Sequence, residues 1–388
     1  MQEFFSPINI AELGNADAYT DSAYGNLIAI HTENEFPELE GANIALIGVE
    51  EDRRSINNEG CALAPNYVRQ HLYALYQGDF KSNIIDLGNI KAGSTIEDTY
   101  FALTEVLTTL LKKNIVPIIM GGGQDLTHCN YLAYKSLEQT INVAAVDACF
   151  DMGDKDEELN SRNYLTKIIL DTPNILFNFS NIGYQTYFVE QSTVEMMNKM
   201  YFDANRLGQM RENMENVEPI VRNADMLSFD MGAIRHSDAS GNSNASPNGF
   251  YGEEACQIAR YAGMSDKLSS IGFYELNPAF DTNKQTAFLL AQMIWYFIDG
   301  YYNRKDDFPI VNKDEYTKYR VALTNHDHEI VFYKSNRSDR WWMDVPYPPN
   351  HKVKYERHHM TPCSYNDYET ACSDEMPDNW WKTYQKLG

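Results

Sequence analysis

The chain has 388 residues, of which 43% are hydrophobic and 22% charged, so it can bury a large core and global disorder is excluded. Its 32 Lys and Arg residues against 55 Asp and Glu give a net charge of −23. Such an acidic surface repels phosphate backbones, so nucleic acid is not an expected partner. No segment has the pattern of a signal peptide or a membrane helix, and the six cysteines form no C-x-x-C pair. We therefore expect a cytoplasmic protein with free thiols and no membrane insertion.

Short apolar runs typical of buried strands alternate with longer helical patterns along the first three quarters of the chain. The predicted strands are 44–49, 84–87, 115–120, 143–146, 175–179, 226–229 and 268–273. The predicted helices are 65–76, 95–112, 126–138, 194–214, 252–262 and 285–302. This alternation predicts an α/β protein with three layers, in which helices cover both faces of a parallel sheet (αβα). In such sheets, ligand sites gather beyond the carboxyl ends of the strands.

The pattern changes near Asn303, so we divide the chain into an αβα domain over 1–302 and an aromatic-rich extension over 303–388. The extension contains two Trp-Trp pairs and five of the nine histidines. Residues 321–324 and 329–334 are expected to pair as an antiparallel hairpin. The histidines lack the spacing of a zinc site, so we expect them on the solvated surface. We expect the extension to pack on the core or on a partner.

Acidic side chains follow three of the predicted strands. Gln124 and Asp125 come after a glycine run, Asp147 and Asp151 after the fourth strand, and Asp230 after the sixth. Carboxylates spaced in this way can converge on one hard cation. The alternative is that each Asp caps a turn or a helix. Their repetition at one sheet edge favours a site.

These segments, in this order, resemble the ureohydrolase superfamily of arginase, agmatinase and formimidoylglutamase. The family pattern G-G-x-H, D-A-H-x-D and S-x-D-x-D is matched by GGGQD at 121–125, DACFD at 147–151 and SFDMG at 228–232. The C-terminal region resembles a formimidoylglutamase-like branch of Bacteroidetes-type bacteria. The resemblance covers roughly residues 40–300 and implies an arginase-like fold with a C-terminal appendage.

The same resemblance suggests substrate contacts. Glu275 stands in Glu-Leu-Asn-Pro, which looks like the family's E-x-N-P segment, whose Glu contacts a planar amidine-type group of the substrate. Asn160 and Ser161 stand where family members carry an N-S-G-T stretch. Asn160, Ser161 and Glu275 are therefore the substrate-binding candidates, and no catalytic residue is assigned.

The metal ligands of the family are only partly present. Family members hold two Mn²⁺ ions with two His and four Asp. Asp147, Asp151 and Asp230 stand at three of these positions. Gln124 stands at the first His position and Cys149 at the second, while Gly232 stands at an Asp position and has no ligand atom. The resemblance thus implies a degenerate metal site.

The two metal positions of the family are affected differently. One family metal would here meet Gln124, Asp147, Asp151 and Asp230. This all-oxygen set suits a single Mg, Ca or Mn ion. The other metal loses the two ligands that it does not share with the first. Cys149 offers a thiolate, which is a soft ligand, and Gly232 has no side chain. We expect one cation at most and no binuclear Mn centre.

Other residues near the predicted site could replace lost ligands. His128, His236 and Asp238 follow the same strand ends, with helix capping or packing as the competing interpretation. Cys149 is disfavoured as a catalytic thiolate, because the two neighbouring aspartates raise the pKa of its thiol.

Three functional hypotheses follow from this pattern. The favoured one is a catalytically silent pseudoenzyme that acts as a binding or scaffold protein, with a protein partner or a second copy of itself. The alternative is a metal-dependent C–N hydrolase of the formimidoylglutamase, arginase or agmatinase class, acting on a guanidino or formimino substrate. A third is binding of a cationic amine without turnover.

Overall fold

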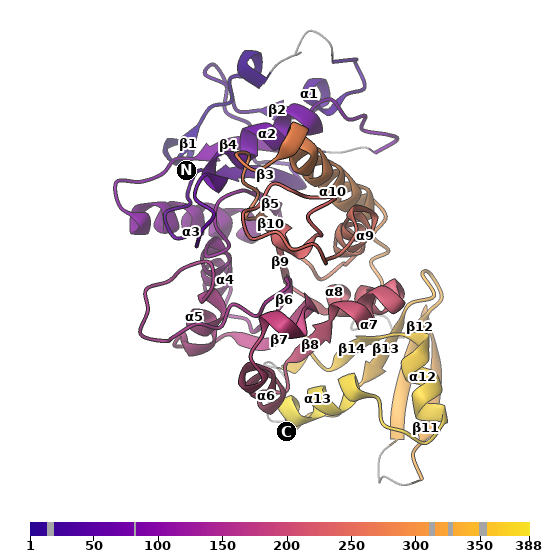
Figure 1. The fold of residues 1–388 in the computed structure, drawn as a ribbon. Coiled ribbons are helices and arrows are strands. Elements are labelled where there is room, and N and C mark those ends of the chain that lie inside the picture. Colours follow the sequence, from indigo (N-terminus) through magenta and orange to yellow (C-terminus); the bar gives the residue numbers. More distant parts are fainter. Residues whose placement is uncertain (14–18, 81–82, 310–314, 325–328, 349–354) are drawn as a thin grey trace.

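The computed structural model describes residues 1–13, 19–80, 83–309, 315–324, 329–348 and 355–388. Within these residues, ten strands form one sheet in the order β1–β4–β3–β5–β10–β9–β6–β7–β8, with β2 beside β4 (Figure 1). β1 (Phe5–Ser6) is antiparallel to β4, and the other neighbouring pairs are parallel. The remaining strands are β2 (Ala29–Ile30), β3 (Ile44–Val49), β4 (Ile84–Ile90), β5 (Val116–Met120), β6 (Ile141–Val146), β7 (Leu176–Tyr184), β8 (Asp203–Arg206), β9 (Met226–Asp230) and β10 (Ser270–Tyr274).

Helices cover both faces of this sheet, because successive strand residues point to opposite sides and both sides are apolar. Leu46 packs into one core cluster and the next residue, Ile47, into the other. The first cluster is covered by α2 (Ala64–Leu72), α7 (Leu207–Glu212), α8 (Val217–Asn223), α9 (Gly252–Gly263) and α10 (Gln285–Tyr302). The second is covered by α3 (Ile96–Lys112), α4 (Leu126–Lys135), α5 (Tyr164–Leu170) and α6 (Gln191–Lys199). The predicted αβα fold is confirmed.

The helix predicted over 194–214 is wrong. The chain there forms α6, then β8, then α7. β8 has the sequence Asp-Ala-Asn-Arg and lies at the edge of the sheet, beside β7. A polar edge strand of four residues has no apolar run, so pairing with β7, rather than a local pattern, determines it. A short helix, α1 (Tyr24–Leu27), lies between β1 and β2 in the chain.

The C-terminal region forms its own antiparallel sheet, β11–β12–β13–β14. The predicted hairpin is confirmed, since β11 (Tyr316–Ala322) pairs with β12 (Glu329–Ser335), while its turn lies outside the described residues. Two more strands and two helices complete the region: β13 (Trp341–Asp344), β14 (Met360–Cys363), α12 (Tyr365–Cys372) and α13 (Asp378–Leu387). Trp341, Trp342 and Trp380 are buried, and Trp381 is partly exposed.

The sequence predicts that the histidines of this region lie on the solvated surface. For two of them this prediction is wrong. His358 is 2% exposed and bonds Thr140 Oγ1 at 2.9 Å, and His359 is 8% exposed and bonds Asp344 at 3.0 Å. His358 therefore joins the C-terminal region to the core, and His359 forms a contact within the C-terminal region. His326, His328 and His351 lie outside the described residues.

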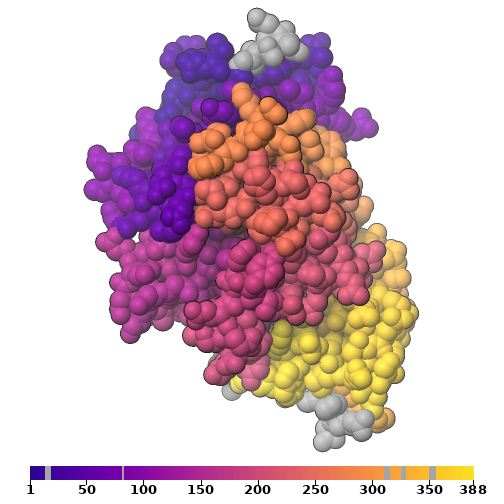
Figure 2. Space-filling model, in the orientation of Figure 1, coloured from indigo at the N-terminus to yellow at the C-terminus, as the bar shows by residue number. Residues whose placement is uncertain are grey.

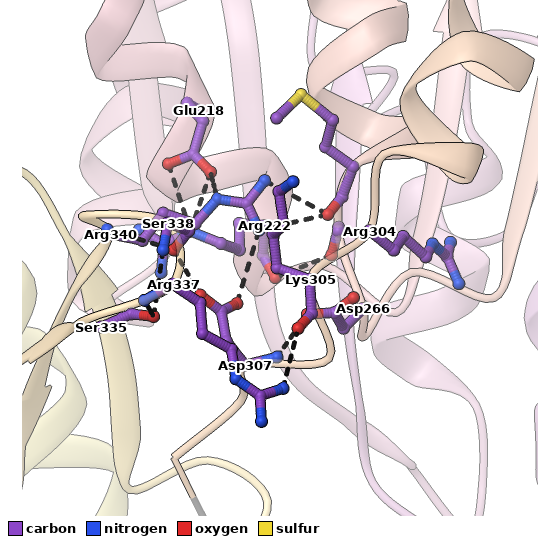
Figure 3. Close-up of polar contacts among 12 residues, drawn as sticks. Glu218, Arg222, Asp266, Arg304, Lys305, Asp307, Ser335, Arg337, Ser338 and Arg340 are labelled. Atoms are coloured by element: carbon purple, nitrogen blue, oxygen red, sulfur yellow. Dashed lines mark hydrogen bonds and ion pairs between the residues drawn. The ribbon is translucent and has the colours of Figure 1, made fainter. Parts of the chain in front are cut away.

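Polar contacts join this region to the core (Figure 3). The buried guanidinium of Arg222 on α8 donates to the carbonyl oxygens of Trp341 and Cys363, and it lies over the Trp342 ring at 4.3 Å. Glu218 accepts from Arg222 and also pairs with Arg340 of the C-terminal region. Figure 2 shows the C-terminal residues, in yellow, directly against the magenta part of the core.

Asn303 follows the last residue of α10, and the division of the chain at this point stays a prediction. Within the described ranges, no helix combines the length and the apolar character needed to span a membrane.

Candidate functional site

Four neighbouring strands position the candidate site. β5, β10, β9 and β6 are adjacent in the sheet, and all four are parallel. Their carboxyl ends therefore lie side by side, and each is followed by one or two of the predicted site residues. These residues are Gln124 after β5, Glu275 after β10, Asp230 at the end of β9, and Asp147 and Asp151 after β6.

The loop after β5 approaches its neighbours too closely for any residue except glycine. Gly122 has a φ of +77°, and a Cβ placed there would lie 2.4 Å from Leu126 and 2.6 Å from the Glu51 carbonyl oxygen. This tight turn brings the backbone N–H of Gln124 to Glu275, whose Oε1 accepts from it at 2.9 Å.

Glu275 is held rigidly at the base of the cleft. Its Oε2 accepts from Ser55 Oγ and from Asn58 Nδ2, both at 2.7 Å, and only 4% of the residue is exposed. Burial raises the pKa of Glu275, and the hydrogen bonds from Ser55 and Asn58 oppose this rise. A carboxylate takes about four hydrogen bonds, so these three leave some capacity for a further donor.

Gln124 lies between the aspartates of the second motif. With its amide oriented to satisfy all its neighbours, Nε2 donates to Asp151 Oδ2 at 3.1 Å and to Asp147 Oδ2 at 3.2 Å, and Oε1 accepts from Ser228. The amide oxygen thus faces Ser228 and the amide N–H groups face the carboxylates. Asp147 also accepts from the backbone N–H of Cys149 at 2.8 Å.

The aspartates are crowded and buried. Burial raises the pKa of Asp147 well above its usual range, and the negative charge of Asp151 adds to the effect. Burial likewise raises the pKa of Asp151 to about 7. Asp230 behaves in the same way, through burial and then through the charges of Asp147 and Glu275. The cluster therefore favours either bound protons or a cation.

Cys149 and Gly232 stand beside this cluster without adding an oxygen ligand. Burial raises the pKa of the Cys149 thiol, and the charges of Asp147, Asp151 and Asp230 raise it further, so the thiolate is disfavoured. Gly232 contributes its backbone N–H, which donates to Asp230 Oδ1 at 2.7 Å. The Nδ2 atom of Asn242 lies 3.1 Å from the point that a Cβ of residue 232 would occupy.

The cleft above the cluster has a volume of about 630 Å³ and is open to solvent. Its lining includes Gln124, Asp147, Cys149, Asp151, Ser161, Asp230, Gly232 and Glu275. Of the residues at the family's metal positions and the substrate-binding candidates, all but Asn160 line this cleft. Asn160 does not belong to the lining; its side chain accepts from the backbone N–H of Arg162 at 2.8 Å.

Sequence reasoning missed several lining residues. Arg162, Asn242 and Ser246 line the cleft, together with a wall from α6 and the segment before it that includes Phe188 and Glu190. Arg162 directly follows Ser161, but the sequence alone does not tell which side chain of a turn points into a cleft.

The three proposed replacements for lost ligands lie elsewhere. None of them is among the described residues that line the cleft. His128 lies on α4 against Tyr131, and burial lowers its pKa to about 4. Asp238 pairs with Arg235 at 2.8 Å and accepts from the Gly252 N–H at the start of α9, while His236 is exposed. Packing explains the position of His128, and capping of α9 explains that of Asp238.

The residues do not fit the two-Mn²⁺ centre that the resemblance implies. Gln124 directs donors rather than an acceptor at the carboxylates, and Gly232 has no ligand atom. No group of three or more His, Cys, Asp or Glu side chains in the described part of the chain is arranged to hold a metal ion. A single cation among Asp147, Asp151 and Asp230 stays a prediction.

Comparisons with known proteins agree with the motif pattern. The model of the Arginase family matches residues 42–299. The formimidoylglutamase of Lysinibacillus sphaericus is 24% identical over 281 residues, which cover 69% of this chain and 87% of that protein. The formimidoylglutamase of Staphylococcus haemolyticus is also 24% identical, over 66% of this chain and 85% of that protein.

Solved structures share the fold. Formimidoylglutamase from Bacillus subtilis superposes with a TM-score of 0.65 at 20% identity, over 73% of this chain and 92% of that one. Trypanosoma cruzi formiminoglutamase with Mn²⁺ has a TM-score of 0.64 at 20% identity, over 69% and 96%. With the family match, the strand-end motifs and the shared fold together, this chain belongs to the arginase family.

Proposed function

We propose that the strand-end cleft binds a small ligand with a planar cationic C–N head group of the guanidino or formimino type. The observation that supports this most is the charge of the cleft base. Asp147, Asp151, Asp230 and Glu275 line one cleft, and none of them forms an ion pair within the described residues. A cation that enters would relieve their mutual repulsion. An amidinium head also offers paired N–H donors, which match carboxylate oxygens.

We further propose that the chain does not hydrolyse this ligand through two metal ions and that it acts as a binding or scaffold protein. Two metals generate a hydroxide at neutral pH because both cations lower the pKa of the bound water. Cys149 and Gly232 provide no hard ligand for a second cation, so one Mg, Ca or Mn ion at most would bind. A silent protein of this kind would act through a protein partner or a second copy.

The second candidate function is hydrolysis of a linear amidine C–N bond, as the names of the relatives suggest. The family match over residues 42–299 and the hydrolase names of the relatives favour this candidate more directly than the silent one. It requires that the altered residues still organise a competent metal centre.

Two measurements on the purified full chain separate these candidates. Calorimetry with a panel of guanidino and formimino compounds measures binding, and product analysis with added Mn²⁺ measures release of urea, formamide or ammonia. Binding without release supports the silent protein, and turnover supports the hydrolase. If no compound binds, the cleft proposal is wrong.

A matched pair of variants ties binding to the cleft. Glu275→Gln keeps the shape of the side chain and removes its charge, so binding should weaken about tenfold or more, as expected for the loss of one charge-assisted hydrogen bond. Glu97→Gln removes an exposed carboxylate on α3 and should leave binding unchanged.

A further inference from the structure

The turn at residues 160–163 places two residues in the cleft lining, the buried Ser161 and the exposed Arg162, and its other side chains hold the turn in place. Asn160 Oδ1 accepts from the Arg162 N–H at 2.8 Å, and Asn163 Oδ1 accepts from the Asn160 N–H at 2.8 Å. Ser161 Oγ accepts from the Ile56 N–H at 3.0 Å. The two residues for which the resemblance suggested substrate contacts thus have structural partners, and Arg162 is exposed at the cleft.

Arg162 carries a charge that no neighbour neutralises in a direct pair. Its Nη2 donates to Asn244 Oδ1 at 2.9 Å, and no salt bridge of Arg162 occurs among the described residues. A guanidinium has five N–H donors, so most of them stay open to a ligand.

Arg162 is also the one cationic side chain among the described residues that line the cleft. The acidic side chains in that lining are Asp147, Asp151, Asp154, Glu190, Asp230 and Glu275. The cleft therefore has an acidic base, formed by the residues after the strands, and a single exposed guanidinium on the turn that borders it.

We propose that Arg162 selects ligands that carry a carboxylate at the end opposite the cationic head. The inference rests on the proposed function, since it assumes that the head lies at the acidic base. A cleft of about 630 Å³ has room for a molecule the size of an amino acid. Arg binds carboxylates through two parallel N–H···O bonds, so it gives this end both affinity and direction.

The competing explanation is that Arg162 only offsets the acidic charge of the cleft. In that case its removal would strengthen the binding of every cationic ligand, whether the far end is acidic or neutral. A preference between two ligands that differ at the far end alone separates the two explanations.

The experiment is calorimetry of the full chain with 4-guanidinobutanoate and its neutral amide, 4-guanidinobutanamide. The wild type should bind the acid about tenfold more tightly, as expected for one Arg–carboxylate pair. Arg162→Gln should bind both equally, and Arg162→Lys should keep part of the preference, because it retains the charge without the fork. Arg320→Gln, at an exposed ion pair of the C-terminal sheet, should behave as wild type.

The outcomes distinguish this inference from the function on which it rests. If the wild type binds both ligands equally, or if Arg162→Gln keeps the preference, the role of Arg162 is wrong while the cleft proposal stands. If the folded wild type binds neither ligand, both are wrong. Circular dichroism confirms that each variant is folded, and Arg162→Lys provides the test if Arg162→Gln does not fold.

Discussion

The amide nitrogen of Gln124 lies 3.1 Å from Oδ2 of Asp151. A neutral donor thus satisfies a buried carboxylate at a position where the family resemblance implies a histidine ligand. The same amide also reaches Asp147, so one glutamine side chain links both aspartates of the second motif. This contact stabilises the cluster without a metal, and it would have to break before the glutamine oxygen could act as a ligand.

Restoring the family ligands should restore metal binding. The triple variant Gln124→His, Cys149→His and Gly232→Asp should bind Mn²⁺ at least about tenfold more tightly than wild type, because three hard or borderline ligands are added. Calorimetric titration with Mn²⁺ measures this. Asn242 must shift by a few tenths of an ångström to admit the new side chain at position 232.

Gln124→His alone is the matched control for this variant. It should increase the affinity for one ion without adding a second binding step, because position 232 still lacks a ligand. A triple variant that binds Mn²⁺ no better than wild type would show that the cluster cannot adopt the geometry of the family.

Arg222 should be a major stabilising residue between the core and the C-terminal sheet. Arg222→Met leaves the carbonyl oxygens of Trp341 and Cys363 without this donor and Glu218 without one of its cations. We expect a loss of about 3 kcal/mol in the free energy of unfolding, measured by urea denaturation. Arg320→Met removes an exposed pair and should cost less than about 1 kcal/mol. Equal losses for both would contradict the assigned role of Arg222.

Removing residues 303–388 tests whether this region is a structural part of the fold. Truncation after Tyr302 deprives Asp225 of Arg357 and Asp203 of Lys382, and it exposes the face of α8. We expect an insoluble or strongly destabilised chain, seen in expression yield and melting temperature. A truncated chain that stays folded but loses a partner or its oligomeric state would identify the region as an interface instead. Unchanged melting temperature and assembly would exclude both roles.

His128 should make the protein less stable in mild acid. Burial lowers its pKa to about 4, while in the unfolded chain it is about 6.5. As the pH falls through this window, the unfolded state takes up a proton that the folded state does not, so the free energy of unfolding decreases. Between pH 7 and 5 this amounts to about 2 kcal/mol at most.

Urea denaturation at the two pH values measures the effect. His128→Gln should remove this share of the acid sensitivity, and His236→Gln, at an exposed position, should leave it in place. If His128→Gln loses as much stability as wild type between pH 7 and 5, the buried neutral state of His128 is wrong.

The sheet was largely predictable because most of its strands are buried on both faces. Ile44–Val49 is apolar at every position, and such runs have few alternatives in a chain that also shows helical patterns. β8 was not predictable, because its polar sequence becomes a strand only through its neighbour β7. The strands β13 and β14 are short and form within a region of mixed pattern, so local sequence gave no clear signal for them.

Some residues of the candidate site could likewise be predicted from the sequence, and others could not. Asp147 and Asp230 could be placed together because each follows a strand of one parallel sheet, and topology brings those ends to one edge. The position of Arg162 in the cleft could not be predicted, because a turn held by Asn160 and Asn163 decides which side chain faces the cleft. Similarly, the donor role of Gln124 depends on Ser228, which is distant in sequence and lies on β9, two strands away from β5 in the sheet.

The number of Mn²⁺ ions that the wild-type chain binds decides whether the binuclear centre is lost. Protein freed of metal by a chelator is titrated with Mn²⁺ in a calorimeter, and the stoichiometry is read from the isotherm. We predict one ion at most per chain, because Cys149 and Gly232 leave the second position without hard ligands. Two tightly bound Mn²⁺ per chain would contradict this prediction.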